Sequence, residues 1–153
     1  MDRAIIGFGQ DPQGDWFARL GCRHIQHVRH QPPFTLRPWV VTEEGRTQHL
    51  GQRLNCLRCE RFEWPDDLVA YKRTPEFTAE TIPNGLRRDH STKQGVWARI
   101  VVLEGRLRYR VDAWDATFEL TSAQNGIVVP EVPHHVAPLG PVRFYVEFHH
   151  AAS

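Results

Sequence analysis

The sequence has few cysteines, only two lysines and no long apolar run. No stretch approaches the roughly 20 apolar residues that a helix needs to cross a bilayer. Residues 1–7 contain only two consecutive bulky apolar side chains, so we expect no signal peptide. The net charge of +1 gives no electrostatic reason to expect a nucleic-acid or membrane partner. These absences argue against a membrane-spanning, a secreted or a nucleic-acid-binding protein, but they do not indicate a reaction.

Three cysteines cannot all pair with one another, so we expect reduced thiols and a cytoplasmic protein. All three lie before Trp64-Pro65, together with four of the nine histidines, whereas both lysines come later. The overall content of 41% hydrophobic and 24% charged residues is typical of a globular chain. This change in composition predicts two domains, residues 1–65 and residues 66–153.

The first domain is so small that it is expected to need a cross-link to stay folded. Because the thiols are expected to be reduced, a bound metal ion is favoured over a disulfide. Cys56 and Cys59 form a C-x2-C pair, and Cys22 and His24 form a second pair upstream, with 31 residues between the two pairs. Three thiolates and one imidazole match a closed structural zinc site. We therefore predict a zinc-stapled module with these four ligands.

Other interpretations of the four residues stay open. A C-x2-C pair can be a redox site, and buried cysteines can serve as small apolar side chains. His27 and His30 compete with His24 for the fourth position. If the segment is extended, Cys22 and His24 share one face and His27 points away, which favours His24.

Local patterns predict a mixed α and β structure for the first domain. Residues 5–8 and 16–20 flank a turn at residues 11–14 and indicate a hairpin. The prolines at positions 32, 33 and 38 favour an extended path. Thr42, followed by two glutamates, is typical of a helix N-cap.

The second domain is predicted to be mainly β. Candidate strands are residues 97–103, 107–111, 117–120, 126–129 and 142–148. Gly105 is expected to form a turn between the first two, and Asn84-Gly85 and Asn125-Gly126 are further turn signals. Several short strands at even spacing indicate a sandwich or a barrel.

The first domain resembles a small bacterial domain of unknown function. The resemblance covers most of residues 5–62 and rests on Gly14-Asp15-Trp16, the run from Cys22 to Pro33, Arg37-Pro38-Trp39-Val40 and the C-x2-C pair. That family usually has glycine where this chain has Arg23. It implies a module with no known reaction.

The second domain resembles the cupin-like domain of tellurite-resistance TehB and YeaR-like proteins. The resemblance covers about residues 68–149 and rests on residues 71–78, His90-Ser91-Thr92-Lys93, Gly95, Trp97, residues 102–105, Pro130, His135-Val136 and residues 144–148. It implies a small β-barrel, or jelly roll, with a polar mouth that can bind a metal. Pro130 and His135 keep the spacing of the second cupin motif, whereas Ala98 replaces the glutamate of the first. The methyltransferase that follows this domain in some TehB proteins is not carried over.

For this second metal we predict His90 and His135 as ligands, with Glu147 as the third. Two imidazoles and a carboxylate suit a divalent zinc, iron or manganese ion with an open position. His134 is expected to be an exposed neighbour. The alternative is that the two histidines bind backbone groups and never meet.

The resulting hypothesis is a cytoplasmic metal-binding protein whose barrel takes a small molecule or oxyanion. By resemblance, its role would be stress response or detoxification, tellurite included. Two rivals are a metal-dependent enzyme that activates water or oxygen and an interaction protein with the barrel as scaffold. A homodimer is also left open.

Overall fold

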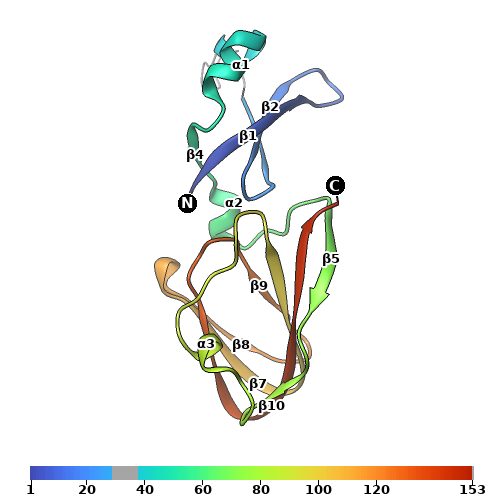
Figure 1. Cartoon of the computed structure of the whole chain (residues 1–153), viewed down its shortest axis with the longest axis vertical. Helices are drawn as coiled ribbons and strands as arrows, with labels where there is room; N and C mark the ends of the chain where they lie inside the picture. The colour runs from blue at the N-terminus through green and yellow to red at the C-terminus, as the bar shows by residue number, and fades with distance from the viewer. Residues whose placement is uncertain (29–37, 153) are drawn as a thin grey trace. The chain divides into compact units, whose positions relative to one another are not determined.

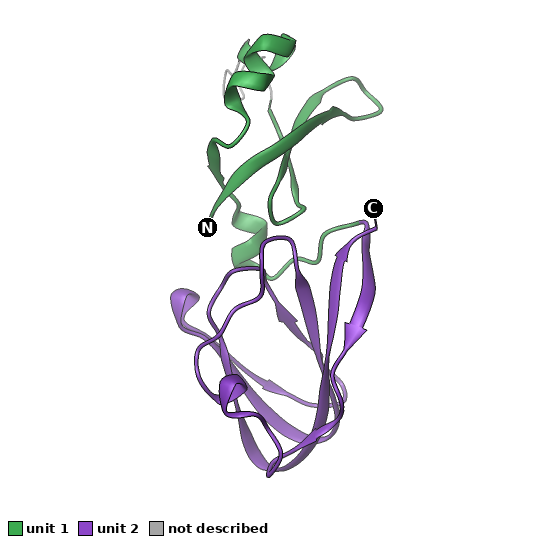
Figure 2. Ribbon diagram, viewed as in Figure 1, with its two compact units in different colours: residues 1–66 green, residues 67–153 purple. Residues whose placement is uncertain are grey.

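The computed structural model describes residues 1–28 and 38–152. The chain forms two compact units, residues 1–66 and residues 67–153, which are coloured separately in Figure 2. The extended path expected at Pro32-Pro33, and His30 with it, lies outside the described residues. None of the described helices is long and apolar enough to span a membrane.

Unit 1 is built on a four-stranded antiparallel sheet with the order β3-β2-β1-β4. The strands are β1 (Asp2–Gln10), β2 (Trp16–Leu20), β3 (Ile25–His27) and β4 (Arg53–Asn55). The predicted hairpin is confirmed: β1 pairs with β2, and the Gly14 N–H donates to the Asp11 carbonyl at 2.9 Å to close the turn. Ile5, Ala18 and Leu20 of this sheet are buried in the core of the unit.

Three short helices complete unit 1: η1 (Pro38–Val41), α1 (Glu43–His49) and α2 (Leu57–Glu60). The predicted cap is confirmed, since Thr42 Oγ1 accepts a hydrogen bond from the Gly45 N–H at 3.0 Å. Glu43 and Glu44 occupy the first turn of α1, where their charges complement the helix dipole.

Unit 2 is a six-stranded sheet that curves around one interior (Figure 1). Its main path is β5-β10-β7-β8, while β6 pairs with β10 and β9 with β7. The elements are β5 (Leu68–Arg73), β6 (Phe77–Thr78), α3 (Asn84–Arg87), β7 (Trp97–Val111), η2 (Asp112–Trp114), β8 (Ala116–Leu120), β9 (Gly126–Val128) and β10 (His135–Ala151). The mainly β class is confirmed.

The turn predicted at Gly105 is wrong. β7 continues through it as one strand, because β10 runs beside both of its halves and pairs with Leu107 as well as with Val102. Gly105 instead bends the strand at φ +79°, opposite a shift in register between Pro138 and Val142. A left-handed residue inside a strand is typical of a bulge, and glycine adopts that conformation at least cost.

We expect Gly105→Ala to lower the free energy of unfolding of unit 2 by about 3 kcal/mol. A Cβ at this position carries the ~1–2 kcal/mol penalty of left-handed backbone and collides with the Pro141 carbonyl oxygen. Gly140→Ala is the matched control, since Gly140 has φ +92° but open space around its Cα. It should cost only the backbone penalty, about 1 kcal/mol. Equal losses for the two variants in denaturant unfolding would contradict the steric argument.

Candidate functional site

Unit 1 contains a buried group of four side chains, the Cys3His cluster (Cys22, His24, Cys56 and Cys59). One donor atom of each lies within 4.8 Å of all the others. None of the three cysteines, all of which the structure describes, forms a disulfide. The four residues come from two segments far apart in sequence, so the cluster ties the β2–β3 turn to α2.

The first segment is a tight turn, which corrects the strand geometry expected for it. Arg23 has φ +75°, and its N–H donates to the Leu20 carbonyl at 2.8 Å. The Leu20 N–H in turn donates to the His24 carbonyl at 3.0 Å. Cys22 and His24 therefore flank a left-handed residue at the tip, the conformation that favours the glycine usual in the resembling family.

The second segment places its two cysteines at the start of a helix. Cys56 is the N-cap of α2, and its N–H donates to the Met1 carbonyl at 2.8 Å. Cys59 lies almost one helical turn later and is fully buried. This spacing brings both sulfurs to one side of the helix start.

The donor atoms are arranged around His24. Its Nδ1 lies 3.5 Å from the sulfur of Cys22, 3.3 Å from that of Cys56 and 3.6 Å from that of Cys59. Its Nε2 lies 2.7 Å from the Glu63 carbonyl oxygen, which can only accept a hydrogen bond. Nε2 therefore carries a hydrogen, and in the neutral ring Nδ1 directs its lone pair at the sulfurs. The cluster fits a structural metal site.

The electrostatics of the cluster favour thiolate next to positive charge. Burial acts to lower the pKa of His24, but hydrogen bonds with the sulfurs of Cys22 and Cys56 outweigh it and raise the pKa to about 9. Hydrogen bonds with Cys22 and Cys59 lower the pKa of the Cys56 thiol. A divalent cation would supply the same positive charge at the centre of the group.

His27 and His30 are the alternatives to His24 as the fourth ligand, and the structure describes the first of them. His27 is exposed on β3, and its Nε2 lies 2.9 Å from Oδ2 of Asp11, away from the cluster. His30 lies outside the described residues.

The ligand set predicted for the second metal, His90, His135 and Glu147, is not brought together. Within the described residues, no group of donor atoms within 4.8 Å contains more than one of the three: His135 groups with Asp89 and Asp112, and His90 and Glu147 belong to no such group. His135 Nδ1 lies 2.8 Å from Asp89 Oδ1, and Glu147 Oε1 lies 2.8 Å from Nε2 of His149. The reason is strand alternation, which directs neighbouring side chains to opposite faces.

His134, expected to be exposed, is instead the buried histidine of this region, with 4% of its surface accessible. Its backbone pairs with that of His90 through two hydrogen bonds of 2.9 and 3.0 Å, and the two rings lie 4.1 Å apart. A signal for this was present in the sequence. Val132, His134 and Val136 alternate as one buried face, and two of the three are apolar.

His90 and His134 line a cavity of about 390 Å³ inside unit 2. Its other polar lining residues are Tyr71, Lys72, Thr74, Ser91, Thr92 and Lys93. Its apolar lining consists of Leu86, Val96, Ala98, Ile100, Val128, Val136, Phe144, Val146 and Phe148. The volume and the apolar walls are typical of a small-molecule site.

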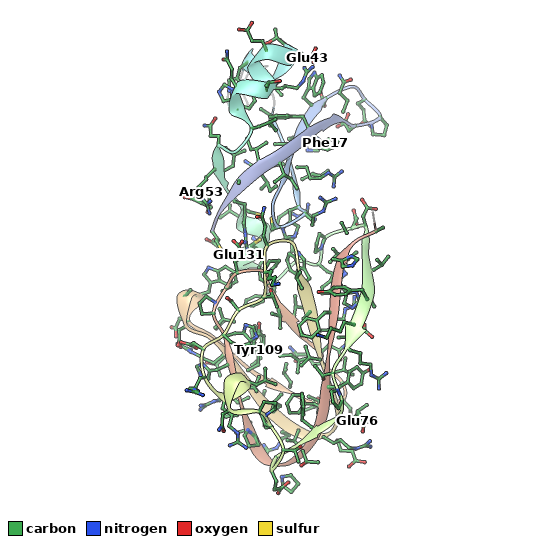
Figure 3. The ribbon with its side chains drawn as sticks, in the orientation of Figure 1. Phe17, Glu43, Arg53, Glu76, Tyr109 and Glu131 are labelled. Atoms are coloured by element: carbon green, nitrogen blue, oxygen red, sulfur yellow. The ribbon has the colours of Figure 1, made fainter. Side chains whose placement is uncertain are left out.

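Backbone carbonyls orient both imidazoles of the cavity. Nδ1 of His90 donates to the Arg88 carbonyl at 3.0 Å, and Nδ1 of His134 donates to the Val132 carbonyl at 3.2 Å. Buried Tyr109, labelled in Figure 3, packs against the His134 ring at 5.6 Å and donates its hydroxyl hydrogen to the Ile127 carbonyl. Nε2 is therefore the remaining acceptor of each neutral ring.

A second group of metal-capable side chains, Asp89, Asp112 and His135, lies outside the cavity lining. Arg110 pairs with Asp112 at 2.7 Å, and His135 pairs with Asp89. Both exposed carboxylates therefore already have a side-chain partner.

Burial, and then the charge of His90, lower the pKa of His134 to about 4. Because the folded protein favours the neutral ring, His134 contributes its full stability above the unfolded pKa of about 6.5. That contribution is lost progressively as the pH falls from 6.5 through 4. We expect a loss of about 2 kcal/mol from unit 2 between pH 7 and pH 5.

Hydrogen exchange of the β7 and β10 amides measures this loss in the whole protein. His134→Asn is the comparison, since asparagine does not titrate in this range. The wild type should lose about 2 kcal/mol more than the variant between the two pH values. The same pH dependence in both proteins would show that His134 is not the group responsible.

Two family models match the chain in succession. Residues 6–63 match "Protein of unknown function (DUF3565)", and residues 72–146 match the "TehB-like domain". The resemblances expected from the sequence are thereby confirmed for both parts of the chain.

The curated relatives are longer proteins. A probable S-adenosyl-L-methionine-dependent methyltransferase TehB from Haemophilus influenzae (strain KW20 / Rd) is 33% identical over 66 residues, which is 43% of this chain and 20% of the relative. A homologous TehB from strain 10810 gives the same identity and coverage. The chain thus spans about one fifth of the length of these relatives.

Solved structures of other proteins resemble part of this chain. The crystal structure of TehB from Haemophilus influenzae has a TM-score of 0.52 and 26% identity, over 56% of this chain and 32% of that chain. A protein from Escherichia coli strain K12 has a TM-score of 0.55 and 23% identity, over 60% of this chain and 98% of that chain. The likeness to the Escherichia coli protein shows that the two folds are similar and says nothing about function.

Proposed function

We propose that this protein binds one structural zinc ion in unit 1 and a small molecule in the cavity of unit 2. The zinc would be held by Cys22, His24, Cys56 and Cys59. The small molecule would occupy the space between the His90–His134 pair and the apolar strands. Each part of the proposal is supported by its own geometry.

The observation that carries the zinc assignment is the set of distances around His24. Bonds of about 2.3 Å to sulfur and about 2.05 Å to nitrogen, arranged as a regular tetrahedron, separate two sulfurs by about 3.8 Å and sulfur from nitrogen by about 3.6 Å. The sulfurs of Cys22 and Cys56 are 3.8 Å apart. The three nitrogen–sulfur distances are 3.3–3.6 Å.

Charge and hydrogen bonding also support zinc. Three thiolates around one Zn²⁺ leave a single negative charge in excess. Hydrogen bonds with Cys22 and Cys56 raise the pKa of the Cys59 thiol, and the guanidinium of buried Arg3 offsets part of that rise. The Glu63 carbonyl accepts a hydrogen bond from Nε2 of His24 and so orients the ring, as backbone carbonyls commonly do for metal-binding histidines. Four protein ligands close the coordination sphere, so the ion would stabilise the fold and leave no position for a substrate.

For unit 2 we favour ligand binding over metal-dependent catalysis. The cavity offers two imidazoles, and no aspartate or glutamate is among its described lining residues to complete a metal site. A role in stress response or detoxification, which tellurite resistance exemplifies, rests on the likeness to TehB. Reduced zinc-binding thiols are in keeping with a cytoplasmic location.

Cys56→Ser and Cys59→Ser should each abolish stoichiometric zinc binding and unfold unit 1 while unit 2 stays folded. Structural zinc contributes about 10–16 kcal/mol of binding free energy, more than the ~5 kcal/mol of stability that a small unit has in total. Metal analysis and backbone amide NMR spectra of the full chain measure both effects. Variants with undiminished zinc content and unchanged unit 1 spectra would refute the structural role.

His24→Ala should weaken zinc binding at least 10–100-fold, the loss typical of disturbing even an outer-shell group. His27→Ala is the matched control, since His27 lies on the adjacent strand and pairs with Asp11 instead. It should leave the affinity nearly unchanged. Competition with a chromophoric chelator gives both values, and equal losses in the two variants would mean that His24 is not the fourth ligand.

A further inference from the structure

Both lysines of the chain, Lys72 and Lys93, line the cavity of unit 2, and every other cationic residue of the sequence is arginine. The two come from separate elements, since Lys72 lies on β5 and Lys93 on the loop before β7. Lys72 is paired in register with Phe148 of β10, which also lines the cavity. Two flexible ammonium groups thus converge on one space from two directions.

Nothing in the cavity offsets this positive charge. No aspartate or glutamate is among its described lining residues. Within the part of the chain that the structure describes, neither ammonium group forms a salt bridge. The buried His134 imidazole stays neutral near pH 7, so the lysines provide the charge. The polar side of the cavity is therefore suited to an anion and unsuited to a cation.

The two lysines and the apolar residues occupy different depths. Lys72 and Lys93 are exposed, whereas Ile100, Val128 and Phe144 are buried. A ligand would therefore meet the ammonium groups at the rim and an aliphatic and aromatic floor beyond them. A small inorganic oxyanion would satisfy only the rim and leave the apolar floor without a contact.

We propose that the cavity of unit 2 binds an organic anion, a small molecule with an apolar body and one carboxylate-like or sulfonate-like head group. The head lies between Lys72 and Lys93, and the body packs on the floor formed by β7, β9 and β10. This assignment rests on the proposed function, because it names the class of molecule for the same cavity. Burial of the body supplies affinity, and the lysines select the charge.

A matched pair of fluorescent probes tests this assignment on the full zinc-loaded chain. 8-Anilinonaphthalene-1-sulfonate has an apolar body with an anionic head, and N-phenyl-1-naphthylamine has the same rings without the head. The anionic probe should bind at least fivefold more tightly than the neutral one. In methyl NMR spectra, both should shift Val128 and Val146. Inorganic phosphate, matched in ionic strength with chloride, should not displace the anionic probe.

Charge-removing variants locate the head group. Lys72→Gln combined with Lys93→Gln should weaken the anionic probe about tenfold and leave the neutral probe within twofold, because two exposed charge contacts are lost. Arg108→Gln is the control: it also removes an exposed cation but lies outside the cavity lining. It should change neither affinity by more than about twofold.

The outcomes separate the two proposals. Equal affinity for both probes, or no response to the lysine variants, would overturn the organic-anion assignment and leave small-molecule binding intact. If inorganic phosphate displaces the anionic probe, the ligand of the cavity is an inorganic oxyanion and not an organic anion. If neither probe shifts the cavity methyl groups, the small-molecule site itself is wrong, and the inference falls with it.

Discussion

Three sulfur atoms and one ring nitrogen meet in the interior of unit 1 at the distances of a tetrahedron's edges. Thiolates gathered in a buried place are unfavourable without a cation, because their like charges would lie close together and out of contact with water. The turn that carries Cys22 and the helix that begins at Cys56 are both oriented toward this point. Strands β3 and β4, at the two edges of the four-stranded sheet, lie between these segments in the chain and depend on the same connection.

The spacing of the cysteines favours the four residues that gather in unit 1, since a C-x2-C pair in so small a domain is typical of a zinc site, but it leaves the choice of histidine open. Strand alternation predicts His24 for the wrong reason, because a turn with left-handed Arg23, and not an extended strand, brings Cys22 and His24 together. No pattern of side chains reveals the φ angle of an arginine. Thr42 shows the opposite case, because a cap is determined by residues within one turn.

In unit 2 the sequence pattern predicts β8, β9 and parts of β7 and β10, but neither β5 and β6 nor the faces of all the strand residues. His134 and His135 are adjacent in the sequence. A shift of one residue in the register of this segment would exchange which of the two side chains faces the cavity. That is why the predicted ligands His135 and Glu147 came out opposite the cavity while His134 came to line it. The sequence gives no sign that Lys72 lines the cavity for a related reason: its position depends on pairing with a strand more than seventy residues away.

The order of the strands in space differs from their order along the chain, and this has a consequence for synthesis on the ribosome. β10 follows every other strand of unit 2, yet it lies between β5 and β7 and also pairs with β6. The sheet therefore lacks its central member until residues 135–151 have emerged from the exit tunnel. Unit 1 can complete its own contacts much earlier, so a nascent chain would carry a finished first unit ahead of apolar segments that still await their partner.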